Sequence, residues 1–129
     1  RICASIEQEI AVLPDEEKEL FLVEYNLPEP GLHKVIHAGF SLLGLHTFFT
    51  CGDKQVRAWT IPVGASAPKA AGEIHTDFER GFIKAEIFQY DEILKHGSEK
   101  ALSELGLIRQ EGKQYIVKDG DCIFFKFNV

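Results

Sequence analysis

The chain has 129 residues, enough for one compact domain or for one small domain with part of another, and too few for a complete two-domain enzyme. A composition that is 45% hydrophobic and 26% charged excludes a disordered or collagen-like chain. The net charge of −6 does not favour binding to DNA or to bulk nucleic acid, which requires many cations to neutralise phosphates. No apolar run approaches the ~20 residues of a membrane-spanning helix, so a membrane role is not expected.

The charge is uneven and the cysteines are few. Residues 1–45 carry three basic and eight acidic side chains, whereas residues 46–129 carry eleven and twelve. The three cysteines are Cys3, Cys51 and Cys122, with no C-x-x-C pair, so neither a disulfide framework nor a zinc site is indicated and a reducing, cytoplasmic compartment fits best. Because the sequence contains no methionine, we expect that an N-terminal portion precedes Arg1.

Residues 1–45 have the apolar period of helices. Ser5 and Gln8 have the spacing of a capping box at the start of the first helix, and Pro14 separates it from a second helix that begins with acidic residues. Pro28 and Pro30 then interrupt the chain. A third helix is predicted up to Gly44, with an apolar stripe of Leu32, Val35, Ile36, Phe40 and Leu43.

From His46 the apolar period changes to two. Residues 47–51 and 56–61 predict a hairpin with a turn at 52–55. A helix capped by Ser66 follows, with Ala71, Ile74 and Phe78 on one face. Residues 82–90 alternate as a half-buried strand, with Ile83, Ala85 and Ile87 on one side.

The remaining residues predict short helices and two further strands. Asp91 and Ser98 are the expected helix caps, and Gly97 and Gly106 the expected ends. Strands are predicted at 115–117 and 122–127, joined by an Asp-Gly turn at 118–121. A hairpin, a helix across it and further strands in a mixed sheet are the order of an α+β, ubiquitin-like β-grasp fold.

Several patterns contain residue types that could carry chemistry. The patterns G-x-x-x-x-G-K-[ST] and G-x-G-x-x-G are both absent, so nucleotide hydrolysis by this chain alone is not expected. His33 and His37 have the spacing of two metal ligands but lack a third, so no metal site is predicted. Ser66, His75 and Asp77 include the residue types of a hydrolase triad, although such residues more often cap helices, and Asp119 and Asp121 fit a plain turn better than a calcium site.

Three longer segments carry a family resemblance. Arg57–Ile61, Ala71–Ile83 and Tyr115–Val129 together resemble the C-terminal part of the YchF, or Obg-like, ATPases. Residues 46–129 resemble the TGS domain, a β-grasp module. By the same resemblance residues 1–45 look like the helical end of a nucleotide-binding domain, with Cys3, Ala4 and Ser5 in place of the loop beside the nucleotide base.

The resemblance implies a function for the whole protein rather than for this chain alone. The parent protein would be a P-loop hydrolase that binds ATP, or GTP, with Mg²⁺ in an upstream nucleotide-binding domain, and no cofactor is expected in this chain. The TGS domain would be a ribosome- or RNA-associated module with a local basic surface, for which the candidates are Arg57, Lys69, His75, Arg80 and Lys84. The alternative is a ubiquitin-like protein-interaction surface that binds no nucleic acid, the basic side chains then being solvated charges.

Overall fold

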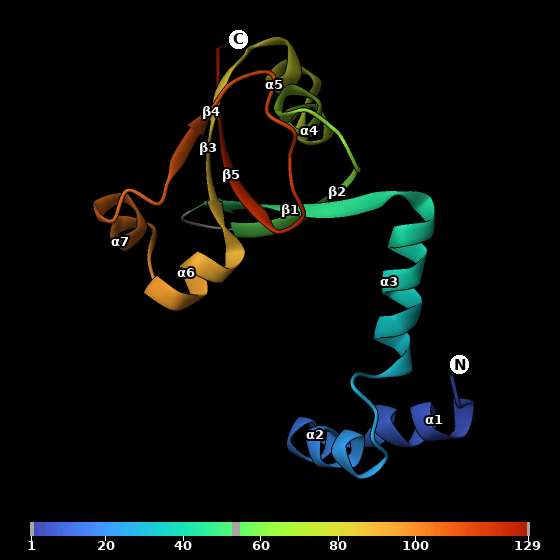
Figure 1. Ribbon diagram of the computed structural model, residues 1–129. Helices are drawn as coiled ribbons and strands as arrows, with labels where there is room; N and C mark the ends of the chain where they lie inside the picture. The colour runs from blue at the N-terminus through green and yellow to red at the C-terminus, as the bar shows by residue number, and fades with distance from the viewer. Residues whose placement is uncertain (1, 53–54, 129) are drawn as a thin grey trace. The chain divides into compact units, whose positions relative to one another are not determined.

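The computed structural model describes residues 2–52 and 55–128 and divides into two compact units that meet between Leu43 and Gly44. The first unit contains α1 (Ala4–Val12), α2 (Asp15–Glu24) and α3 (Gly31–Leu43), drawn in blue to cyan in Figure 1. Within it, the Glu7 carboxylate accepts a hydrogen bond from the Gly31 amide at 2.7 Å and so ties α1 to the start of α3. Gly44 has φ +62°, which only glycine adopts without strain, and the predicted end of α3 at this residue is confirmed.

The apolar stripe of α3 is largely solvent-exposed. Leu32, Val35, Ile36 and Leu43 are 46–70% exposed, and Phe40 is half-buried. A helix face of this kind is typical of an element that packs against another surface.

The second unit is a five-stranded mixed sheet with helices on both faces. Its elements are β1 (Leu45–Gly52), β2 (Gln55–Pro62), α4 (Ala67–Ile74), α5 (Thr76–Arg80), β3 (Phe82–Gln89), α6 (Tyr90–His96), α7 (Glu99–Glu104), β4 (Arg109–Glu111) and β5 (Asp121–Phe127). The strand order is β2-β1-β5-β3-β4, with β1 and β5 parallel and every other pair antiparallel. This order is that of the predicted α+β β-grasp fold. Asp53 and Lys54, the centre of the predicted hairpin turn, lie outside the described residues.

Each face of the sheet buries its own apolar cluster. On one face α4 contributes Ala67, Ala70 and Ala71, whose small side chains let the helix lie close to Phe48 and Ile87. On the other face Leu102 of α7 packs with Phe88 of β3 and Cys122 of β5, and Ile93 of α6 lies against this cluster. Successive residues of β5 alternate between the two clusters, as the period of two requires.

Five local predictions were wrong, each for an identifiable reason. The first helix begins earlier than predicted, with Cys3 at its N-cap, so Ser5 lies in the first turn and makes no capping box. The helix predicted from Ser66 to Phe78 is two helices, because the chain is extended at His75. Ile83 is 55% exposed because a register shift between Phe82 and Lys84 turns it outward and buries Phe82 instead.

The N-cap of α6 is Gln89 rather than Asp91, since the strand runs directly into the helix, whereas Ser98 caps α7 as predicted.

The predicted strand at 115–117 is also absent from the sheet. The Tyr115 carbonyl accepts the Ala67 amide at the start of α4, and the Val117 amide donates to the Ala65 carbonyl. Between them lies one isolated bridge, Ser66 with Ile116. The edge strand β4 was not predicted, because three residues are too few to show a period of two.

Candidate functional site

A buried carboxylate organises one end of the sheet. Asp121, the first residue of β5, is fully buried and lies opposite Gln89, the last residue of β3. Its Oδ2 accepts hydrogen bonds from the Tyr115 hydroxyl at 2.8 Å and from the Lys118 amide at 2.8 Å, and its Oδ1 accepts one from the Gln89 side-chain amide. Three donors stabilise a carboxylate that would otherwise be costly to bury. This hydrogen-bonded set, Asp121 with its three donors, is named the Asp121 network below.

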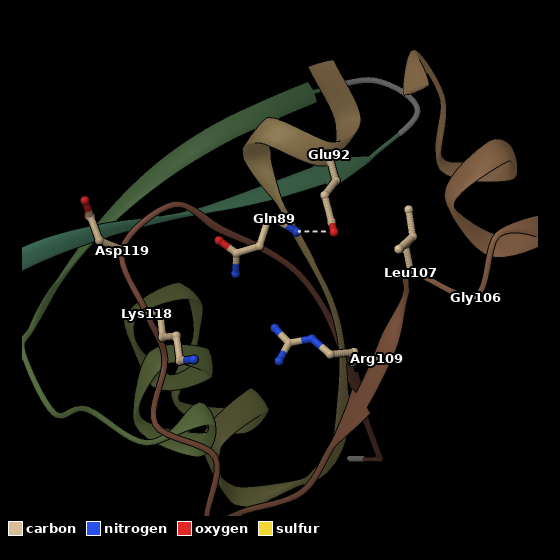
Figure 2. A pocket seen from close by; sticks show the side chains of 7 residues that line it. All are labelled: Gln89, Glu92, Gly106, Leu107, Arg109, Lys118 and Asp119. Carbon is tan, nitrogen blue, oxygen red and sulfur yellow. Dashed lines mark hydrogen bonds between the residues drawn. The ribbon is translucent and has the colours of Figure 1, made fainter. Parts of the chain in front are cut away.

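The network lies beside an open pocket of about 460 Å³. The pocket is lined by Gln89, Glu92, Gly106, Leu107, Arg109, Lys118 and Asp119 (Figure 2). Arg109 reaches it because the register of β3 and β4 pairs Arg109 with Ile87, so that Arg109, Gln89 and Asp121 stand on the same face of the sheet.

Figure 2 shows the Arg109 guanidinium and the Lys118 ammonium pointing toward one another across this space, below the Gln89 amide.

The pocket holds an equal number of cations and carboxylates, but they are not paired with one another. The Asp119 Oδ1 accepts a hydrogen bond from the main-chain amide of Thr47 at 2.8 Å. The Glu92 Oε2 lies 3.4 Å from the main-chain amide nitrogen of Gln89. The nearest carboxylate oxygen to Arg109 belongs to Glu111, at 3.8 Å, and Lys118 makes no ion pair within the described part of the chain. The pocket therefore offers two cationic groups to a ligand.

The Arg109 guanidinium also lies over the Tyr115 ring, 5.9 Å from its centre. Burial, followed by the hydrogen bond to Asp121, raises the pKa of Tyr115 to about 12. The phenol is therefore a hydrogen-bond donor throughout the physiological range of pH.

Three of the sequence-predicted residues come together where α4 meets α5. The Lys69 ammonium lies 2.6 Å from a Glu79 carboxylate oxygen, and this contact raises the pKa of Lys69. The His75 Nδ1 accepts the Asp77 amide at 3.1 Å and caps α5. Arg80 is 78% exposed and lies 3.7 Å from an Asp77 oxygen. Lys69 and Arg80 thus each lie near a carboxylate of α5, Glu79 and Asp77 respectively.

The other predicted residues lie elsewhere. Arg57, on the edge strand β2, stacks over the Trp59 ring at 4.2 Å, while the Trp59 indole donates to the Thr50 hydroxyl at 2.9 Å. Lys84, on β3, lies 3.0 Å from the Gln110 side chain and 3.7 Å from Glu86.

Cys3, Ala4 and Ser5 belong to the first unit, where all three are exposed at the start of α1. Within residues 2–52 and 55–128 no three metal-ligating side chains come together.

The pocket itself was not predicted from the sequence. Its residues come from three segments far apart in the chain, and the Asp-Gly turn was interpreted only as a turn. One feature of the sequence could have indicated it. Gln89 and Asp121 are polar residues at the ends of apolar strands, where polar side chains of neighbouring strands often come together.

Comparison with known proteins decides the family. The family model YchF-GTPase_C, described as a protein of unknown function (DUF933), matches residues 45–128. This chain belongs to the YchF family.

A YchF relative from Escherichia coli O157:H7, named a ribosome-binding ATPase, is 56% identical over 128 residues, which cover 99% of this chain and 35% of that protein. The corresponding protein of Bacillus subtilis is 53% identical with the same coverage, and the Obg-like ATPase 1 of Rattus norvegicus is 52% identical over 96% of this chain and 31% of its own length. The chain thus spans about a third of the length of these YchF and Obg-like relatives.

Solved structures agree with this assignment. The YchF GTPase of Schizosaccharomyces pombe matches with a TM-score of 0.81 and 35% identity, over 97% of this chain and 33% of that one. A GTP-binding protein from Pyrococcus horikoshii matches with a TM-score of 0.55 and 19% identity, over 85% of this chain and 30% of its own, a likeness of fold alone. Searching the described residues for a helix long and apolar enough to cross a membrane yields none.

Proposed function

We propose that this chain is the C-terminal, ribosome-associated part of a cytoplasmic YchF-type ATPase. The β-grasp unit contacts ribosomal RNA or its immediate surroundings, and the helical unit is the end of a nucleotide-binding domain whose upstream part holds ATP, or GTP, with Mg²⁺. The observation that carries the proposal is the 56% identity, sustained over 99% of the chain, to a protein named a ribosome-binding ATPase.

The chain's own residues do not supply a triphosphate site. No phosphate-binding loop occurs in the sequence, and Cys3, Ala4 and Ser5 offer at most a contact to the nucleotide base. We therefore expect the isolated chain to show no magnesium-dependent ATP hydrolysis, and turnover by the pure chain would contradict this division of labour.

Among the predicted basic residues, Arg57 and Arg80 are best placed to reach RNA. Among the residues that the structure describes, no carboxylate forms an ion pair with Arg57, and its guanidinium lies on an aromatic ring, an arrangement on which a base can stack. Arg80 is 3.7 Å from Asp77, too far for a strong hydrogen bond, and highly exposed.

The second candidate is a protein-interaction surface. It is favoured by the pairing of Lys69 with Glu79 and of Lys84 with Glu86, which makes a mosaic of both charges rather than a basic patch.

Cosedimentation of the chain with purified ribosomes over a range of salt concentrations separates the two. Binding through RNA phosphates falls steeply with salt, by about one power of the salt concentration for each phosphate neutralised. Arg80→Ala and Arg57→Ala should each weaken the association while leaving the free energy of unfolding within about 0.5 kcal/mol of wild type.

Lys95→Ala, at another exposed lysine of the same unit, is the matched control and should bind as wild type. Association that is insensitive to salt and to both arginine changes would favour the protein surface, and no association even at low salt would refute the proposal.

A further inference from the structure

We propose that the pocket between the end of β3, the start of β4 and the turn before β5 binds the phosphate and sugar of a ribonucleotide. Arg109 and Lys118 converge on one space (Figure 2). Two cations that point at the same volume repel each other unless an anion lies between them. The Glu111 oxygen at 3.8 Å is too distant to hydrogen-bond Arg109. The guanidinium also interacts with the Tyr115 side chain, and its remaining N–H groups can make the two-point contact that phosphate favours.

Both cationic side chains also extend from backbone that is held in place by hydrogen bonds. Arg109 is held in register with Ile87 of the neighbouring strand. Lys118 donates its amide to the Asp121 carboxylate at 2.8 Å and accepts the Asp121 amide at 3.2 Å, so both of its backbone groups are anchored by one buried residue. Preorganised groups lose less conformational entropy when a ligand binds. The Asp121 network therefore holds the backbone beside this pocket in one conformation.

The two carboxylates of the pocket favour a ligand more specific than a bare anion. Asp119 is committed to the Thr47 amide and points away from the pocket centre in Figure 2. Glu92 points inward and uses one oxygen on the Gln89 amide, so the other is free to accept a hydrogen bond from a ligand hydroxyl or amino group.

The preferred ligand thus joins a phosphate to hydrogen-bond donors, as a ribonucleotide does. The volume of about 460 Å³ lies within the range of small-ligand pockets.

The ribonucleotide has two possible sources, a free mononucleotide or one residue of an RNA strand. The choice of RNA as the source rests on the proposed function, because a ribosome-associated unit meets RNA strands. The preference of the pocket for phosphate does not depend on the proposed function.

The test is an NMR titration of the full chain with adenosine 5′-monophosphate, inorganic phosphate, adenosine and a short single-stranded RNA. We expect the monophosphate to shift the amide signals around Gln89, Leu107–Arg109 and Lys118, and to bind more tightly than inorganic phosphate or adenosine. Tighter binding of the RNA with the same shifts assigns the site to a strand, and equal binding assigns it to the free nucleotide.

Substitutions make the inference falsifiable. Arg109→Ala and Lys118→Ala should each weaken monophosphate binding about tenfold or more, the loss of a charge-assisted hydrogen bond. Glu92→Gln keeps an acceptor for Gln89 but removes the charge, so inorganic phosphate should bind better and the preference for the nucleotide should narrow. Lys113→Ala, an exposed lysine in the same connection, is the control and should change nothing.

Two results would overturn the inference. One is the absence of shifts at the pocket with every ligand, and the other is an equal loss of binding in the Lys113 control, which would show a diffuse surface charge. If ribosome association survives both pocket substitutions and the pocket binds no nucleotide, this inference fails while the proposed function stands. Nucleotide binding at the pocket without ribosome association gives the reverse result.

Discussion

Asp121 offers a direct test of how hydrogen bonds hold the β-grasp unit together. In Asp121→Ala the Tyr115 hydroxyl, the Gln89 amide and the Lys118 amide all lose their acceptor. Hydrogen bonds to a charged group contribute about 1.5–3 kcal/mol each. Because Tyr115 and Gln89 lie near the pocket and can turn toward water, the expected loss in the free energy of unfolding is about 3–5 kcal/mol, out of the ~5–15 kcal/mol typical of a small domain.

Asp121→Asn is the matched variant. Its amide oxygen can still accept from Tyr115 and Lys118, while its NH₂ faces Gln89, whose own amide can turn to present oxygen. This change should cost only about 1 kcal/mol. Urea unfolding followed by the fluorescence of Trp59, the single tryptophan of the sequence, measures both values in the β-grasp unit. An asparagine variant as unstable as the alanine variant would refute the hydrogen-bond accounting and show that the charge itself is required.

Three further perturbations have expected outcomes. Phe78→Ala should destabilise the unit by about 2–3 kcal/mol in the same urea assay, less than a fully buried phenylalanine, because Phe78 is only partly buried where it stacks on Phe127 at 3.7 Å. Gly81→Ala should lower the free energy of unfolding by about 2 kcal/mol or more, since its new Cβ would lie 2.1 Å from the Asn128 carbonyl oxygen. Gly39→Ala, on α3 where no atom lies near the new Cβ, should stabilise its helix slightly. Thermal unfolding of both variants checks this, and equal effects would contradict it. Burial raises the pKa of Tyr115 from 10.0 to about 12, so the folded state holds this proton more tightly than the unfolded state. Because the side chain is only partly buried and solvent screens its interactions, stability should fall by about 1–2 kcal/mol, less than the full shift implies, as the pH rises through that window. Tyr115→Phe should flatten the decline, and an unchanged slope would count against it.

The sequence predicted the elements that have a repeated apolar pattern or a residue that clearly ends a helix. The three N-terminal helices, the β1–β2 hairpin pairing and the last strand follow from repeated apolar patterns, and Gly44 ended α3 as expected. The errors lie where a tertiary contact overrides a local pattern. The period of two places Ile83 on the same face as Ala85, but the register shift of β3 against β5 turns the Ile83 side chain to the opposite face. Tyr115–Val117 has the residues of a strand but pairs with the loop before α4.

The candidate site was less predictable than the fold, for a physical reason. The basic residues chosen from the sequence were those near the family motifs, and the structure places Lys69 and Lys84 against carboxylates that are close in space. The pocket depends instead on strand register, which sets Arg109 beside Gln89 and Asp121 although 20 or more residues separate Gln89 from each of them. Register of this kind is fixed by pairing between distant segments and leaves no local pattern.

The central position of β5 constrains the order in which the chain can fold during synthesis. β5 follows the other strands in the chain, yet it lies between β1 and β3 and is the only described strand that joins the β1–β2 hairpin to the β3–β4 pair. Its parallel pairing brings Cys122 beside Phe49, so the ring closed by this contact includes most of the unit. Until a ribosome has released residues 121–127, the hairpin and the β3–β4 pair expose the edges that will later receive β5, which are open to wrong pairing. A chain of this topology should therefore fold late and slowly, in the range of milliseconds or longer.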